Sequence, residues 1–487
     1  MAIARKIAYN VVFSSVAKVF STILALVAIG FITRYLGAEG FGNYATVLAF
    51  LSFFAAITDL GLNQISTREI SRTGADEKKI IGNIFCLRAL SSLTIIIIAP
   101  VTVFFLNYPL EVKKGILIVA VSFLFSSTYQ ILNGVFQKNL AMDKVALGEL
   151  MGKIVQVAFV ILAVRLELGF DWIMAALLFN SIASFLVVFF WSKKYLRFKL
   201  QVDFKYWKEF LKESMPLGIS AVITFIYFKM DTLILASLKG SADVGIYNAA
   251  YKVLENITFF PAMIVGLVLP ILARNVFENR ERFTDIANKT FKVFVILVVP
   301  LVVGTLFLAD GVINIIGGEE FAQAGNVLRI LVFALAFIFF GQLFNAVLVV
   351  SNLQKKLMII LAIAAVVNIS LNLIFIPKFS YMAAAYVSLI TEIVVVSLGL
   401  YLSVRKAKFI PVPERIFSIL LAGSMMGLFL YLFRGYTLIS PEINFVFLSV
   451  GSAGIYFFFL WVFRAIKTEE IKSLINKKGI ENYEELS

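Results

Sequence analysis

Fourteen apolar segments divide this chain, and each is long enough to cross a lipid bilayer as a helix. A bilayer core of about 30 Å requires about 20 helical residues, each adding about 1.5 Å. The pattern therefore predicts an all-α polytopic membrane protein with about 14 transmembrane helices. The segments are approximately 9–33, 43–61, 81–106, 115–135, 146–165, 171–191, 215–237, 244–271, 288–309, 326–350, 357–376, 381–403, 415–433 and 443–463.

The composition supports this class and excludes several others. Hydrophobic residues make up 61% of the chain and charged residues 15%, and the mean hydropathy is +0.93. A soluble domain is not this apolar, whereas a polytopic membrane protein is. The single cysteine, Cys86, excludes an internal disulfide, and the lack of histidine excludes catalysis or proton relay through imidazole. We expect no metal site and no cofactor.

The distribution of Lys and Arg over the loops predicts the orientation of the helices. Alternate loops and the two termini carry 31 cations on one side and 7 on the other. By the positive-inside rule, both termini lie in the cytoplasm of a multi-pass cell-membrane protein. Arg5 and Lys6 precede an apolar run that is too long for a signal-peptide core, so we interpret it as an uncleaved first span. The net charge of +14 then reflects topology, and no nucleic-acid partner is expected.

A short turn between the first two apolar segments recurs near the middle of the chain. Its glycines and tyrosine, Gly37, Gly42 and Tyr44, correspond to Gly240, Gly245 and Tyr247 at a constant separation of 203 residues. In the first copy, Gly37 suits the left-handed end of a helix, and Arg34 can reach the headgroups. Tyr44 suits the membrane–water boundary. We predict an internal repeat of about half the chain, with the residues of these turns as gate or turn residues.

The repeat and the loop lengths predict two six-helix lobes, residues 1–191 and 215–404. The longest cytoplasmic connection, residues 192–214, is basic and aromatic, and we expect it to lie in the headgroup plane. Because six helices per lobe is an even number, the lobes should be related by a pseudo-two-fold axis along the membrane normal, with a cleft between them. Residues 405–463 add helices 13 and 14, and residues 464–487 form a cytoplasmic tail with basic and acidic residues.

Several motifs resemble the polysaccharide-transporter family of the multidrug/oligosaccharidyl-lipid/polysaccharide exporter superfamily. They are Arg34-Tyr-Leu-Gly37, Gly42-Asn-Tyr-Ala45, Asp59-Leu-Gly-Leu62, Arg68-Glu-Ile-Ser-Arg72, Val244-Gly-Ile-Tyr247 and Gly318-Glu-Glu-Phe-Ala322. The resemblance covers about residues 1–405. It implies twelve to fourteen helices in two lobes and flipping of lipid-linked oligosaccharides by alternating access. It assigns no individual substrate-binding residue, because the family is divergent.

Three cations inside the predicted membrane segments are candidates for binding an anionic headgroup. Lys18, Arg88 and Lys153 each lie about 8–10 residues from the cytoplasmic start of their helix, which is roughly 12–15 Å deep. Charges at that depth are costly and need a partner or a function. The alternative is a structural role through ion pairing or snorkelling, and Glu149 could neutralise Lys153.

A second group of intramembrane charges lies on helices seven, eight and twelve. Similar depths on adjacent helices predict two ion pairs, Asp231–Lys252 and Lys229–Glu255. These pairs are either a structural network or carboxylates for which a coupling proton or sodium ion competes. Glu392, near the middle of helix twelve, is an acidic candidate for the same role. At the cytoplasmic end of helix two, we expect Asp59 to act with Arg68 or Arg72 as a gate or cap.

The resulting functional hypothesis is a flippase that exports a polyprenyl-pyrophosphate-type oligosaccharide for surface polysaccharide or glycan assembly. The expected partners are membrane lipids, the anionic lipid-linked glycan and a coupling H+ or Na+, and we expect a monomer. A peptidoglycan-precursor flippase or a multidrug exporter of the same superfamily is the alternative. A polytopic glycosyltransferase or polymerase fits less well, because the chain has no Asp-x-Asp pair, no histidine and no large outer loop. We therefore expect no enzymatic activity.

Overall fold

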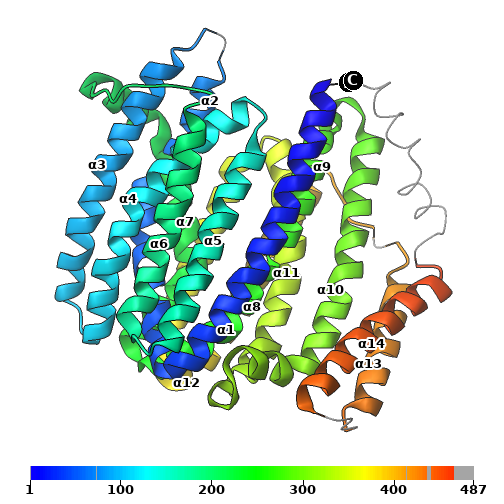
Figure 1. Cartoon of the computed structure of the whole chain (residues 1–487). Helices are drawn as coiled ribbons and strands as arrows, with labels where there is room; N and C mark the ends of the chain where they lie inside the picture. Colours follow the sequence, from blue (N-terminus) through cyan, green and yellow to red (C-terminus); the bar gives the residue numbers. More distant parts are fainter. Residues whose placement is uncertain (1, 73, 413, 436–439, 466–487) are drawn as a thin grey trace. The chain divides into compact units, whose positions relative to one another are not determined.

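The computed structural model describes residues 2–72, 74–412, 414–435 and 440–465 (Figure 1). Every regular element in these ranges is helical. Most of the predicted tail, residues 466–487, lies outside the described residues. The elements are α1 (Ala2–Asp59), α2 (Leu62–Ile70), α3 (Glu77–Phe104), α4 (Leu110–Lys138), α5 (Met142–Arg165), α6 (Phe170–Ser192), α7 (Phe204–Leu238), α8 (Ser241–Ile257), α9 (Phe259–Glu278), α10 (Arg280–Gly317), η1 (Glu319–Phe321), α11 (Ala324–Val350), α12 (Gln354–Arg405), α13 (Ile416–Phe433) and α14 (Pro441–Val462).

Twelve helices of the described chain are long and apolar enough to cross a membrane. The polytopic all-α class is therefore confirmed, whereas the number of fourteen spans stays a prediction. Two helices are much longer than one bilayer core requires, α1 with 58 residues and α12 with 52. Each has a non-helical residue inside it, Gly37 (φ 65°) in α1 and Ser380 (φ 50°) in α12. Both lie between apolar segments that the sequence pattern separates.

Two helices begin well before their predicted apolar segments. α7 begins at Phe204, not near residue 215, and α10 begins at Arg280, not near residue 288. At α7, the Asp203 carboxylate caps the new start by accepting a hydrogen bond from the Tyr206 backbone N–H at 3.0 Å. Much of the predicted 192–214 linker is thus helical. Hydropathy missed these residues because the added turns are polar and charged.

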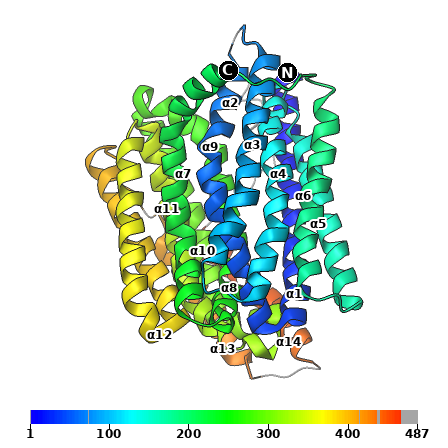
Figure 2. The same cartoon turned by 90° about the vertical axis from the view of Figure 1, so that its left-hand side faces the viewer.

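The structure forms two compact units. Unit 1 comprises Met1–Ala249, Ile316–Phe321 and Leu361–Val387, and unit 2 comprises Ala250–Ile315, Ala322–Ile360 and Ser388–Ser487. In unit 1, α4 packs against α3 and α6, and α5 packs against α6 and α1 (Figures 1 and 2). In unit 2, α13 and α14 pack together, and the Tyr456 hydroxyl donates to the Ile296 carbonyl of α10 at 2.8 Å. The lobe boundaries inferred from sequence stay predictions.

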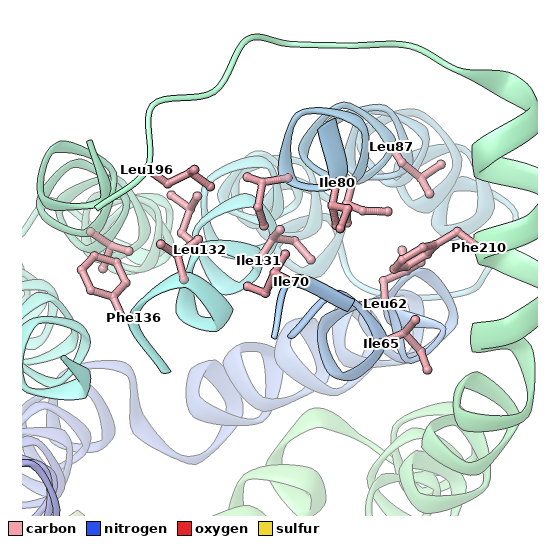
Figure 3. Packing of buried hydrophobic residues seen from close by; sticks show 14 of the residues in the cluster. Leu62, Ile65, Ile70, Ile80, Leu87, Ile131, Leu132, Phe136, Leu196 and Phe210 are labelled. Atoms are coloured by element: carbon pink, nitrogen blue, oxygen red, sulfur yellow. The ribbon is translucent and has the colours of Figure 1, made fainter. Parts of the chain in front are cut away.

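A hydrophobic cluster holds one end of unit 1 together (Figure 3). It joins α2, α3 and α4 to the start of α7 and to the segment before it. Burial of aliphatic and aromatic side chains is the main source of cohesion at this end. The residues labelled in the figure are Leu62, Ile65, Ile70, Ile80, Leu87, Ile131, Leu132, Phe136, Leu196 and Phe210.

Candidate functional site

The two sequence-related turns contact each other in unit 1. A Cβ added at Gly42 would overlap the Ser241 carbonyl oxygen and lie 2.9 Å from the Gly245 nitrogen. A Cβ added at Gly245 would overlap the Ala38 carbonyl oxygen and lie 3.2 Å from the Gly42 nitrogen. Ala38 and Ser241 are themselves 203 residues apart, so the contact is reciprocal, as a local two-fold axis requires. Only glycine permits this approach of the backbones.

Different partners stabilise the two turns. At the first turn, the Glu320 carboxylate accepts a hydrogen bond from the Ala38 N–H at 2.8 Å, directly after the break at Gly37. At the second turn, the Lys239 ammonium donates to the Pro377 carbonyl at 2.9 Å, and Ser380 hydrogen-bonds to Asp243. Sequence reasoning missed Glu320 and Asp243 as turn partners. Their only signal was an acidic residue within or near a predicted outer loop.

Tyr44 and its repeat counterpart Tyr247 are both buried in the protein. The placement of Tyr44 at a membrane–water boundary stays a prediction. The Tyr44 ring stacks on Phe41 at 5.7 Å between centroids, and the Tyr247 hydroxyl donates to the Asp231 carboxylate. A buried tyrosine usually finds a hydrogen-bond partner for its hydroxyl inside the protein, as Tyr247 does. Arg34 is exposed, and its reach to the headgroups stays a prediction.

Arg88 is enclosed by protein, with only 2% of its side chain exposed. Its guanidinium forms an ion pair with Asp59 and donates to the Thr58 carbonyl at 3.0 Å. Asp59 was expected to pair with Arg68 or Arg72, so this partner is a correction. In this state the guanidinium of Arg88 contacts Asp59 and Thr58 at the end of α1, so these donors do not bind a phosphate.

The other predicted gate cations belong to a network between α2 and α7. Arg68 forms ion pairs with Glu69 at 2.8 Å and with Glu213 of α7, and Arg72 pairs with Glu69 at 2.8 Å. Beside this network, Leu60 (φ 41°) and Gly61 (φ 72°) separate α1 from α2. The ion pairs of this network link α2 to the N-terminal part of α7. The side chains of Arg68 and Arg72 are largely exposed, so the pairs contribute little stability by themselves.

The two predicted lysines lie on other helices of unit 1. Lys18 of α1 is exposed on the protein, and Lys153 of α5 is half-buried. The Lys153 ammonium donates to the Gln156 side-chain oxygen at 3.0 Å, and the same oxygen accepts from the Asn180 amide at 3.0 Å. Sequence reasoning considered Glu149 as a charge that could neutralise Lys153, and it missed Gln156. Its signal was a polar residue three positions away, on the same face of an apolar helix.

Asp231 of α7 is buried in a polar cluster. Besides the Tyr247 hydroxyl, it accepts a hydrogen bond from the Thr232 N–H at 2.7 Å, and Thr232 donates to Asn248 at 3.4 Å. Sequence reasoning missed Thr232 and Asn248, because neither residue is charged.

The remaining charged candidates lie in unit 2, apart from Lys229. Lys252 pairs with Glu255 at 2.6 Å within α8, and Glu392 is buried in α12. The pairs Asp231–Lys252 and Lys229–Glu255 would join residues of the two units, and they stay predictions. Among the described residues, no group of three or more Cys, Asp or Glu could hold a metal ion.

Comparison with known sequences identifies the family. The family described as "Polysaccharide biosynthesis protein" matches residues 7–276, and the "MatE" family matches residues 216–374. The chain belongs to the polysaccharide biosynthesis protein family. The predicted family membership is therefore confirmed, and the match includes the first-turn and second-turn motifs of this family member.

The alignments with known relatives cover most of this chain. It is 24% identical over 384 residues to the "Probable low-salt glycan biosynthesis flippase Agl15" of Haloferax volcanii, covering 76% of this chain and 78% of that protein. It is 23% identical over 316 residues to the "Capsular polysaccharide biosynthesis protein CapF" of Staphylococcus aureus, covering 63% of this chain and 79% of that protein. Among solved structures, the lipid II flippase MurJ in an inward closed conformation superposes with a TM-score of 0.76 at 18% identity, covering 96% of this chain and 100% of MurJ. This similarity shows the fold.

Proposed function

We propose that this chain is a flippase that moves a lipid-linked oligosaccharide across the cell membrane by alternating access, for surface polysaccharide or glycan assembly. The observation that carries the proposal is the similarity to Agl15, a protein named as a glycan biosynthesis flippase, over 76% of this chain. The family match and the multi-pass helical fold support it. Its relatives carry the names of flippases and transport or biosynthesis proteins, which favours a transporter over an enzyme.

The proposed orientation places both termini in the cytoplasm. It is supported by the excess of Lys and Arg in alternate loops. In this orientation, the two contacting turns lie at the outer face, and α2 and the start of α7 lie at the inner face. We also propose that the protein acts as a monomer.

The proposed substrate carries a pyrophosphate, which is prohibitively costly to move through hydrocarbon without compensating charge. Lys18 and Lys153 supply cations within the inner half of unit 1, and the exposed Lys18 is the more accessible of the two. Arg88 has a different part in this proposal, because Asp59 already neutralises it. It reaches a headgroup only in a state in which the Asp59 contact has opened. A moderate affinity for the headgroup suits transport, since a site that binds the substrate too tightly in one state cannot release it in the other.

For energy coupling, we propose H+ or Na+ at the intramembrane carboxylates. Asp231 is buried beside hydroxyl and amide groups, a setting in which a cation or proton compensates the charge. Glu392 and the Lys252–Glu255 pair are the further candidates in α12 and α8. Lys229 of α7 is the remaining charged candidate, and we propose that it pairs with Glu255.

Deletion of the gene followed by extraction of lipid-linked sugars tests the proposal. We expect one lipid-linked oligosaccharide to accumulate on the cytoplasmic leaflet and the wild-type gene to clear it. The double variant Lys18→Gln/Lys153→Gln should clear it much more slowly at an equal amount of folded protein. The control is Lys289→Gln, which removes an exposed cation of α10.

The outcomes separate the alternatives. Accumulation of a peptidoglycan precursor would favour a precursor flippase, and loss of drug resistance without a lipid intermediate would favour a multidrug exporter. No change in any lipid-linked sugar would overturn the proposal. Equal clearance by the double variant and the control would place the headgroup site elsewhere.

A further inference from the structure

The segment between α6 and α7, residues 193–203, is fixed on the first turns of α3; we call it the strap. The Asp203 N–H donates to the Asn83 side-chain oxygen at 2.9 Å, and the Trp207 indole N–H donates to the Asn83 carbonyl at 3.1 Å. Gly82 lies directly under the Lys199 carbonyl, where a Cβ would overlap it. The strap is therefore an ordered part of unit 1, held by backbone and side-chain hydrogen bonds.

The strap contacts α3 through residues 201 and 203 and leaves their neighbours exposed. The Asn83 amide donates to the Gln201 side-chain oxygen at 3.3 Å, and the Asp203 N–H donates to Asn83. The alternate residues are large and apolar, and they are exposed: Leu200 at 68%, Val202 at 57% and Phe204 at 75%. These three side chains form an apolar ridge that stays largely exposed in the described part of the chain, although the Phe204 ring also meets the Trp207 ring at 5.3 Å.

Cations surround this apolar ridge. The exposed basic residues of the strap and the first turns of α7 are Lys193, Lys194, Arg197, Lys199, Lys205, Lys208 and Lys212. Of the three acidic residues in the strap and the first turns of α7, Asp203 lies 3.5 Å from Lys79, Glu213 pairs with Arg68, and Glu209 is exposed, so seven cations outnumber them. The Tyr206 backbone N–H and Lys79 lower the pKa of Asp203, so this carboxylate stays ionised beside its partners. The surface that remains is positive around an apolar ridge.

A second segment, in unit 2, has the same design. Residues 406–412 follow α12 as the strap follows α6. The Phe409 ring is buried and meets Phe283 edge-on at 6.1 Å, and the Val412 N–H donates to Asn288 at 2.9 Å. Ile410 and Val412 are exposed beside the exposed cations Lys406 and Lys408. Each half of the chain thus ends its sixth predicted span with an anchored, basic segment that exposes alternate apolar side chains.

We propose that the strap docks in the headgroup layer of the inner leaflet and selects anionic lipids. Leu200, Val202 and Phe204 enter the boundary between headgroups and acyl chains, and the surrounding cations contact the lipid phosphates. Because Asn83 and Trp207 fix the strap to α3 and α7, docking ties this end of unit 1 to the membrane surface. The proposal rests on the proposed orientation, with the strap on the cytoplasmic side.

The test places a fluorescent label on the ridge in a defined lipid bilayer. In a Cys86→Ser background, Leu200→Cys and Val202→Cys are labelled with bimane, and the protein is placed in nanodiscs. The discs contain phosphatidylcholine alone or phosphatidylcholine mixed with phosphatidylglycerol, with a nitroxide-bearing lipid as quencher. Since the scaffold protein of the discs is the same in both preparations, a difference between them reports on the lipid that covers the ridge.

We expect the labels to be quenched by the lipid nitroxide much more strongly in the discs with phosphatidylglycerol. Replacing Lys193, Lys194, Arg197 and Lys199 by Gln should remove this preference, by up to about fivefold for each cation near the surface. The matched control replaces Arg282 and Lys289, exposed cations of α10, and should retain it. Added salt should weaken the preference, because it screens charges that lie in water.

Equal quenching in the two lipid mixtures, or quenching by aqueous iodide in both, would overturn the assignment. A separate measurement tests the orientation on which it rests. An impermeant maleimide should label Lys199→Cys in inverted vesicles and not in intact cells. Labelling in intact cells would reject the cytoplasmic placement. A normal flipping rate in the Gln variants with lost lipid preference would leave the flippase proposal standing.

Discussion

The first turn, residues 33–45, and the second turn, residues 238–247, share a sequence pattern. They differ in backbone conformation and in the residues that stabilise them. Both present a glycine to the other, Gly42 to the Ser241 carbonyl and Gly245 to the Ala38 carbonyl. The first turn breaks at Gly37, with φ 65°, whereas the second passes through Lys239 in an extended conformation, with φ −132° and ψ 173°. Gly240 has no neighbour within 4 Å of an added Cβ.

This difference separates what the repeat requires from what each copy is free to change. A reciprocal backbone contact constrains both copies at once, so the glycine recurs in both. A helix end can be satisfied by any suitable donor or acceptor, and the two copies use Glu320 in one case and the Asp243–Ser380 and Lys239–Pro377 contacts in the other. We therefore expect substitutions at Gly42 and Gly245 to lower stability by similar amounts. Substitutions at Gly37 and Gly240 should lower it by different amounts.

The largest effect is expected from Gly42→Val and Gly245→Val. Each added side chain overlaps backbone of the other turn, which cannot move as a flexible side chain can. Overpacking of this kind costs about 3 kcal/mol. Thermal unfolding of the purified protein in detergent measures it, with Gly240→Ala as a control that should change stability by less than about 0.5 kcal/mol. If Gly42→Val were as stable as the control, the reciprocal contact would not exist.

A medium effect is expected from Gly37→Ala. At φ 65° and ψ −175°, Gly37 is in a region open essentially to glycine alone, where a residue with a Cβ costs about 1–3 kcal/mol. The new Cβ would also lie 2.8 Å from a Glu320 carboxylate oxygen and would push it away from the Ala38 N–H. The corresponding change in the second turn, Gly240→Ala, should be nearly neutral in the same unfolding measurement. Equal losses at both positions would mean that the two breaks are alike after all.

The smallest effects concern the side chains that stabilise each turn. Glu320→Gln keeps an acceptor for the Ala38 N–H but removes the negative charge at a helix start, and should cost about 1 kcal/mol. Asp243→Asn should cost less, about 0.5 kcal/mol, because Ser380 can still donate to the remaining oxygen. Unfolding in parallel experiments ranks the two. The reverse order would show that the second turn depends more on its acidic partner than the first.

Local pattern was sufficient for the helical class, the family and the pair of related turns. Apolar segments, loop charges and the spacing of Gly37, Gly42 and Tyr44 are all properties of short stretches of chain. Hydropathy was not sufficient for helix boundaries, because the first turns of α7 are polar and are stabilised by burial of Trp207 and Phe210 in the cluster of Figure 3. The candidate site was predicted less well. The sequence singled out Arg88 and Lys153 as charged residues inside apolar segments, but it did not predict their contacts with Asp59 and Gln156.

Partner choice is a property of three-dimensional packing. The depth of Arg88 in its helix suggested a headgroup site, but the end of α1 brings Asp59 and the Thr58 carbonyl to its guanidinium. The repeat spacing identified Gly42 and Gly245 as equivalent, yet only packing of α1 against α8 revealed that they meet. The charge and hydrophobicity of a residue can be read from its own position in the sequence. The choice among many chemically acceptable partners depends on which helices the fold places side by side.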